Sequence, residues 1–150
     1  MSDTTRTILL VEDNPDDVLL ILHALSQHAS TYSVHVSRDG AEAIRYLLGS
    51  PESSQLDDLP EVIIMDIKMP RMNGLDVLKR IRATTRTRSV PVVLFTSSDE
   101  TRDIHDGYKL GANSYVHKPT SFDDLMATID QLARYWTGVN LPPPAVSQAD

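Results

Sequence analysis

One stretch organises the whole chain: Val62-Ile63-Ile64-Met65-Asp66-Ile67-Lys68-Met69-Pro70. Four apolar residues lead into a carboxylate, a pattern typical of a strand buried in a parallel sheet. An ionised Asp66 at the end of such a strand is costly unless another group pairs with it. Because ligands bind outside the carboxyl ends of the strands in open α/β sheets, we expect chemistry at Asp66.

Strand-like and helix-like segments alternate along the rest of the chain. Strands are predicted over residues 8–11, 32–36, 62–65, 91–96 and 114–117, each followed by a helical pattern. Asn14-Pro15 and Asp39-Gly40 are helix start signals, and Gly111 is a stop signal. Five strands alternating with five helices predict one α/β domain, a doubly wound parallel sheet with helices on both faces.

Composition excludes several classes of function. The 150 residues carry a formal net charge of −7, which argues against sequence-independent binding of nucleic acid. The chain has no cysteine, so disulfide and thiol chemistry are excluded. The polar N-terminus lacks the core of a signal peptide, and no apolar run approaches the roughly 18 residues of a membrane span. We therefore expect a cytoplasmic protein without a membrane partner.

Polar residues stand at the carboxyl ends of four of the predicted strands, namely Glu12 and Asp13, Asp66, Thr96 and Lys118. In a doubly wound sheet these strand ends converge on one crevice. Three carboxylates need a counter-charge there, and Mg²⁺ is a natural one because it prefers carboxylate and phosphate oxygens. A carboxylate nucleophile, a metal ion, a lysine and a hydroxyl favour phosphoryl transfer to the aspartate.

The chain resembles the receiver domain of two-component response regulators. The matching segments lie in order along nearly the whole chain: Val11-Glu12-Asp13-Asn14-Pro15, residues 62–70 with Asn73-Gly74, Thr96-Ser97-Ser98, and Gly111-Ala112 through Lys118-Pro119. This resemblance implies a flavodoxin-like fold with strand order 2-1-3-4-5. It also implies a receiver domain over residues 1–137, and residues 138–150 as a tail that is either extended or part of a dimer contact.

The resemblance implies the phosphoacceptor and the metal ligands. Asp66 is expected to accept the phosphoryl group from a sensor histidine kinase. Asp13, Asp66 and the backbone carbonyl of Lys68 are expected to bind Mg²⁺, with Glu12 acting through water. No catalytic turnover is expected beyond phosphorylation and dephosphorylation of the protein itself.

The resemblance also implies a phosphoryl-binding switch. Thr96 and Lys118 would bind the phosphoryl group, and Ser97 would be the small neighbour that leaves the site accessible. Tyr115 matches the aromatic switch residue, although an edge-strand aromatic would give the same pattern. The signal would leave through the face made by the fourth helix, the fifth strand and the fifth helix.

Two further features resemble the single-domain regulators that partner bacterial and cyanobacterial phytochromes. These features are the long loop over residues 49–60 and the C-terminal segment over residues 135–142. Such regulators imply a bacteriophytochrome as the kinase and a homodimer formed through the last helices and the tail. The dimer candidates are Phe122, Leu125, Ile129 and Trp136, although this apolar stripe is equally what a core-facing helix requires.

Two other functions remain open. One is a constitutive interaction module without phosphotransfer, against which the intact set of carboxylates, Thr96 and Lys118 argues. The other is a metal-dependent phosphatase with an aspartate nucleophile, which would want a second acid two residues after Asp66, where Lys68 stands.

Overall fold

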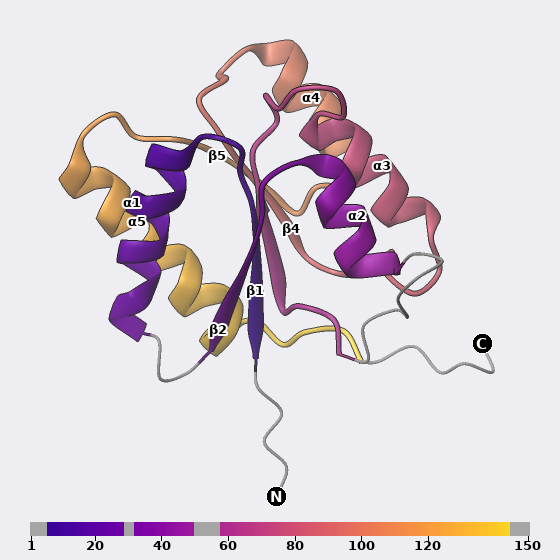
Figure 1. Ribbon diagram of the computed structural model, residues 1–150, viewed down its shortest axis with the longest axis horizontal. Coiled ribbons are helices and arrows are strands. Elements are labelled where there is room, and N and C mark those ends of the chain that lie inside the picture. The colour runs from indigo at the N-terminus through magenta and orange to yellow at the C-terminus, as the bar shows by residue number, and fades with distance from the viewer. Residues whose placement is uncertain (1–5, 29–31, 50–57, 145–150) are drawn as a thin grey trace, which may run out of the picture.

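A computed structural model describes residues 6–28, 32–49 and 58–144 of the chain. Five parallel strands form one sheet in the order β2-β1-β3-β4-β5, which confirms the expected topology (Figure 1). The strands are β1 (Thr7–Val11), β2 (Ser33–Ser37), β3 (Val62–Met65), β4 (Val92–Thr96) and β5 (Ser114–His117). At the carboxyl end of the sheet, Val11 pairs with Ser37 on one side and with Met65 on the other.

Five helices cover the two faces of the sheet. They are α1 (Pro15–Leu25), α2 (Gly40–Leu48), α3 (Gly74–Ala83), α4 (Thr101–Lys109) and α5 (Phe122–Arg134). In Figure 1, α1 and α5 lie on one face, and α2, α3 and α4 lie on the other. No helix within the described ranges is both long and apolar enough to cross a bilayer.

Side-chain caps explain where several helices begin. The Asn14 side chain accepts hydrogen bonds from two amides of the first turn of α1, and Pro15 occupies the first helical position, as predicted. Asp39 caps α2, and Asn73 forms a reciprocal capping box at the start of α3. These caps stand in the connections that follow β1, β2 and β3, so they order the loops at that edge of the sheet.

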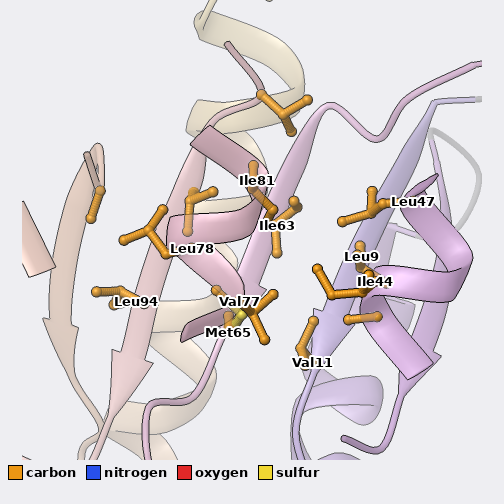
Figure 2. Packing of buried hydrophobic residues seen from close by; sticks show 14 of the residues in the cluster. Leu9, Val11, Ile44, Leu47, Ile63, Met65, Val77, Leu78, Ile81 and Leu94 are labelled. Carbon is orange, nitrogen blue, oxygen red and sulfur yellow. The ribbon is translucent and has the colours of Figure 1, made fainter. Parts of the chain in front are cut away.

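The face covered by α2 and α3 contains the larger part of the core. β3 is buried along its whole length, as predicted for the central strand. Figure 2 shows side chains of β1, β3 and β4 packed against the two helices; labelled are Leu9, Val11, Ile63, Met65, Leu94, Ile44, Leu47, Val77, Leu78 and Ile81. Each fully buried aliphatic side chain contributes about 1.5–3 kcal/mol to the free energy of unfolding, so this core holds the strands and their carboxyl ends in place.

The face covered by α1 and α5 corrects part of the predicted dimer surface. Leu125 and Ile129 of α5 are buried against β1, β3 and β4 residues in the second core cluster, so they cannot contribute to a contact between two copies. Their apolar stripe serves the alternative role, that of a core-facing helix. Phe122 is half exposed, whereas Trp136 packs partly against the same core cluster.

Helix α4 is the most weakly anchored of the five helices. Gly107 is its only buried residue, and no side chain caps its N-terminus. A Cβ added at Gly107 would lie 2.7 Å from a methyl carbon of Leu94, so the helix rests directly on β4. Gly111 follows α4 at φ +106°, which confirms the predicted stop. Few buried apolar contacts are typical of an element that can shift.

The chain beyond the ends of α3 and α5 carries further structure. The segment that follows α3 contains a fully buried Thr87 whose hydroxyl donates to the carbonyl of Ile81. Helix α5 continues into a π-helical turn (Tyr135–Val139), so the predicted domain boundary at residue 138 falls inside this turn. Residues 50–57 of the long loop and residues 145–150 of the tail lie outside the described residues.

Candidate functional site

The polar residues predicted to converge lie side by side at the carboxyl edge of the sheet. The backbone ladder continues past the strand ends, because the Asp66 amide donates to the carbonyl of Val11 at 3.0 Å. On the other side, the Lys118 amide donates to the carbonyl of Thr96 at 2.7 Å. These backbone hydrogen bonds fix the positions from which the side chains of β1, β3, β4 and β5 extend.

Three carboxylates form an acidic cluster at this edge. Oxygen atoms of Glu12, Asp13 and Asp66 all lie within 4.8 Å of one another. Glu12 is 1% and Asp66 7% exposed, and the Ile67 amide donates to Asp66 Oδ1 at 2.8 Å. The Asp13 carboxylate has no hydrogen bond or ion pair with any residue that the structure describes. Three clustered carboxylates, of which Asp13 has no paired cation among the described residues, fit a hard divalent cation such as Mg²⁺.

Lys118 is the cation beside this cluster. Its Nζ donates to Glu12 Oε1 at 2.7 Å and to Asp17 Oδ2 at 2.9 Å, and lies 3.5 Å from Asp66 Oδ2. Asp17 was not among the predicted site residues, since Asp16 and Asp17 both read as charges that complement the α1 dipole. The available signal was its closeness in sequence, because Asp17 stands only four residues after Asp13, in the first turn of α1.

Burial and pairing alter the protonation of this cluster. Burial raises the pKa of Glu12 to about 7, although the hydrogen bond from Lys118 works against the rise and the charge of Asp66 adds to it. Burial alone would lower the pKa of Lys118, but its hydrogen bonds to Glu12 and Asp17 and the charge of Asp66 raise that pKa on balance. Lys118 is therefore charged near neutral pH, whereas Glu12 exchanges its proton there.

The residues predicted as the switch come from β4, from the loop between β4 and α4, and from β5 and its end. Thr96 is fully buried, and its hydroxyl oxygen accepts from the Ser98 amide at 3.3 Å. The Tyr115 hydroxyl donates to the carbonyl oxygen of Ser98 at 2.9 Å. The ring nitrogen Nε2 of His117 lies 3.1 Å from the carbonyl oxygen of Ser97. Ser97 itself is exposed. Two side chains of β5 thus tether the β4–α4 loop.

An ion pair links the loop after β3 to α4. Lys68 Nζ lies 3.5 Å from Asp103 Oδ2, and the same oxygen accepts from the Ser98 hydroxyl at 2.6 Å. Asp103 was not predicted, because a charge in the first turn of a helix has an ordinary explanation in the helix dipole. The carbonyl of Lys68 as a metal ligand stays a prediction.

Gly74 holds the loop after β3 against the strand end. Its amide donates to the carbonyl of Ile67 at 2.9 Å. A Cβ at this position would lie 2.2 Å from the carbonyl oxygen of Asp66. The Asn73-Gly74 pair of the sequence is therefore needed as a cap followed by a residue without a side chain.

Comparison with known proteins agrees with this geometry. The family model described as the response regulator receiver domain matches residues 8–130. The chain is 36% identical over 136 residues to the probable methanogenesis regulatory protein FilR2 of Methanothrix harundinacea, covering 91% of this chain and 86% of that protein.

Two solved structures of phytochrome response regulators are similar to this chain. The phosphorylated cyanobacterial regulator RcpA has a TM-score of 0.87 at 30% identity, covering 94% of this chain and 100% of that chain. The bacteriophytochrome response regulator RtBRR has a TM-score of 0.72 at 42% identity, with 94% and 86% covered. The protein is a member of the family of response regulator receiver domains.

Proposed function

We propose that this receiver domain accepts a phosphoryl group on Asp66 from a sensor histidine kinase and that Mg²⁺ is required. The observation that carries the proposal is the buried Asp66 carboxylate, which shares an acidic cluster with Glu12 and Asp13 and lies 3.5 Å from the ammonium of Lys118. Such a set of groups suits an in-line transfer, in which catalysis is mostly positioning and charge stabilisation.

The two oxygens of Asp66 have different surroundings, which supports a division of roles. Oδ1 accepts from the Ile67 amide, whereas Oδ2 is the oxygen near Lys118. Oδ2 would attack the phosphorus atom, the phosphorus–nitrogen bond of the phosphohistidine would break, and the electron pair would leave with the histidine nitrogen. Lys118 would stabilise the charge on the transferred oxygens. A Mg²⁺ bound by Asp13 and Asp66, with Glu12 near it, would supply further positive charge there.

The conformational signal would pass through Thr96 and α4. A new dianionic group on Asp66 would attract the Thr96 hydroxyl, which would then release the Ser98 amide. Tyr115 holds the carbonyl of that same Ser98, so the tether and α4 would change together. The weak anchoring of α4 supports a shift between two arrangements of the face formed by α4, β5 and α5.

We further propose a phytochrome-type kinase as the phosphodonor, in the cytoplasm, and a homodimer as the responding assembly. The likeness to RcpA and RtBRR supports the kinase class. Exposed apolar side chains at the end of α5 and beyond it support the dimer: Tyr135, Val139 and Leu141. Phe122 remains a candidate, since it is half exposed at the start of α5.

The phosphatase alternative is less favoured on chemical grounds. An aspartate-nucleophile phosphatase needs a general acid near the leaving group, and Lys68 stands where that acid would be expected. Lys68 is paired with Asp103 instead. We therefore propose a phosphoacceptor protein rather than an enzyme with a small-molecule substrate.

Intact-protein mass spectrometry after incubation with acetyl phosphate tests this function. One added phosphoryl group is expected with Mg²⁺, and none after chelation of the metal or in Asp66→Asn. Asp16→Asn is the matched control, because Asp16 is exposed and has no side-chain ion pair with a described residue. An unmodified wild-type protein, with acetyl phosphate and also with a phytochrome-type kinase, would favour the constitutive interaction module.

A further inference from the structure

Lys118 has two tight acidic partners, and only one of them belongs to the acidic cluster. Glu12 lies in the cluster with Asp13 and Asp66, whereas Asp17 stands outside it, in the first turn of α1. A cation bound by the cluster would compete with Lys118 for Glu12. It would not compete for Asp17, whose carboxylate is not near enough to the other oxygens to join the set.

We propose that Asp17 is a positioning residue that aims the Lys118 ammonium at the phosphoacceptor oxygen of Asp66; this rests on the proposed function of Asp66. An ammonium group has three donor hydrogens in a fixed tetrahedral arrangement. Glu12 at 2.7 Å and Asp17 at 2.9 Å take two of them. The third is left for Asp66 Oδ2, which lies 3.5 Å from Nζ, the longest of the three contacts.

The local structure of α1 makes Asp17 a firm anchor. Its amide donates to the Asn14 side chain at 3.1 Å, so the backbone of Asp17 is part of the helix cap. Its side chain is 33% exposed and Lys118 is 11% exposed, so the pair is partly shielded from water. A lysine side chain has four flexible bonds and loses much conformational freedom when held, so a second fixed partner sets its direction.

Two readings of Asp17 predict opposite results. If Asp17 is only one more negative charge near the site, Asp17→Asn lowers the repulsion of an anionic phosphodonor and phosphorylation becomes faster. If Asp17 positions Lys118, the same substitution replaces a charge-assisted hydrogen bond with a weaker neutral one, the ammonium is held less firmly, and phosphorylation becomes slower. Asp16→Asn removes an equal charge from the same helical turn but no ion pair, so it measures the purely electrostatic effect.

The first arm measures phosphorylation of the whole chain by acetyl phosphate with Mg²⁺, followed by intact mass. Loss of the charge-assisted hydrogen bond that holds the Lys118 ammonium in place predicts a rate about tenfold lower for Asp17→Asn. Asp17→Glu, which can still reach Lys118 with a carboxylate, is expected to recover most of the rate. Asp16→Asn is expected to match the wild type or to exceed it slightly.

The second arm needs neither metal nor phosphodonor. In metal-free protein labelled with ¹⁵N at lysine, hydrogen-bonded ammonium protons of Lys118 exchange slowly with water and give a distinct resonance. That resonance is expected to lose its protection in Asp17→Asn and to keep it in Asp16→Asn. A merely structural role for Asp17 would change the melting temperature without changing this resonance.

The outcomes separate the two proposals. A rate for Asp17→Asn equal to or above that of Asp16→Asn, or a Lys118 resonance unchanged by Asp17→Asn, would overturn the positioning role and leave the phosphoacceptor proposal standing. A wild-type protein that takes up no phosphoryl group would overturn both. A slower rate together with loss of the protected resonance would support both.

Discussion

Replacing Gly74 with alanine is expected to disable the site from a residue that contacts no substrate. The new Cβ would lie 2.2 Å from the carbonyl oxygen of Asp66 and 3.0 Å from the carbonyl carbon. A Cβ contact shorter than 3.0 Å essentially never occurs, so the two groups must separate by at least 3.0 − 2.2 = 0.8 Å. The obstacle is backbone at the end of β3, which cannot rotate away as a side chain could.

The size of the effect follows from this displacement. Overpacking costs typically about 1–3 kcal/mol, and we expect about 3 kcal/mol because backbone meets backbone. For a chain of this length, that corresponds to a fall in melting temperature of roughly 6–12 °C. A misplacement of about 1 Å can reduce the rate of a reaction by about 100-fold, so phosphorylation by acetyl phosphate is expected to fall by about that factor.

The assay combines thermal unfolding by circular dichroism with the rate of phosphorylation measured by intact mass. Gly138→Ala is the matched control, because a Cβ at Gly138 has no neighbouring atom within 4 Å. This control is expected to unfold within about 0.5 kcal/mol of the wild type and to be phosphorylated normally. A Gly74→Ala protein with the melting temperature and the rate of the wild type would refute the role assigned to this backbone contact.

Three further predictions concern the acidic cluster, the hydrogen bonds that Arg82 donates to backbone carbonyls, and the tether of the β4–α4 loop. Because the pKa of Glu12 is raised to about 7, a proton on Glu12 competes with Mg²⁺ below neutral pH. Calorimetry should find that the protein binds Mg²⁺ about tenfold more weakly at about pH 6 than at about pH 8. The Glu12→Gln substitution should remove this pH dependence. Arg82 donates to the carbonyls of Gly111 and Val90, so Arg82→Ala should lower the free energy of unfolding by about 2–3 kcal/mol in urea, whereas exposed Arg80→Ala should change it little. Tyr115→Phe removes the hydrogen bond to the loop, worth about 1 kcal/mol, so amide hydrogen exchange in α4 should become about fivefold faster; unchanged exchange would contradict the tether.

The fold and the strand-end residues could be predicted because each has a local signal. A buried strand needs an uninterrupted apolar run, and the residue that ends the run in a parallel sheet faces the ligand side. Asp66 and Thr96 were found in this way. The helix starts at Asn14 and Asp39 were found because a cap depends on residues only two or three positions away.

The residues that were missed depend on contacts between distant segments. Asp17 joins the site only because Lys118, 101 positions later, reaches across from β5. Asp103 joins it through Lys68, a residue of another loop. In both cases, the helix dipole already explained an acidic residue in a first turn, so the sequence offered no reason to look further.

The predicted dimer residues show a second limit of periodicity. A helical stripe indicates which residues share a face of the helix. It does not indicate whether that face packs against the sheet or against a partner subunit, because both contacts use apolar residues. Leu125 and Ile129 proved to face the sheet. Three exposed apolar residues lie at and beyond the π-helical turn, where the regular spacing of the stripe ends: Tyr135, Val139 and Leu141.

The central claim is that Asp66 carries the phosphoryl group as an acyl phosphate. The most direct test treats the phosphorylated protein with borohydride, which reduces an aspartyl phosphate to homoserine, and then sequences the proteolytic peptides by mass spectrometry. The account predicts homoserine at position 66 alone, with Glu12, Asp13 and Asp17 unchanged. Homoserine at position 13 or 17, or a phosphoryl group that survives reduction on a histidine or a hydroxyl, would contradict it.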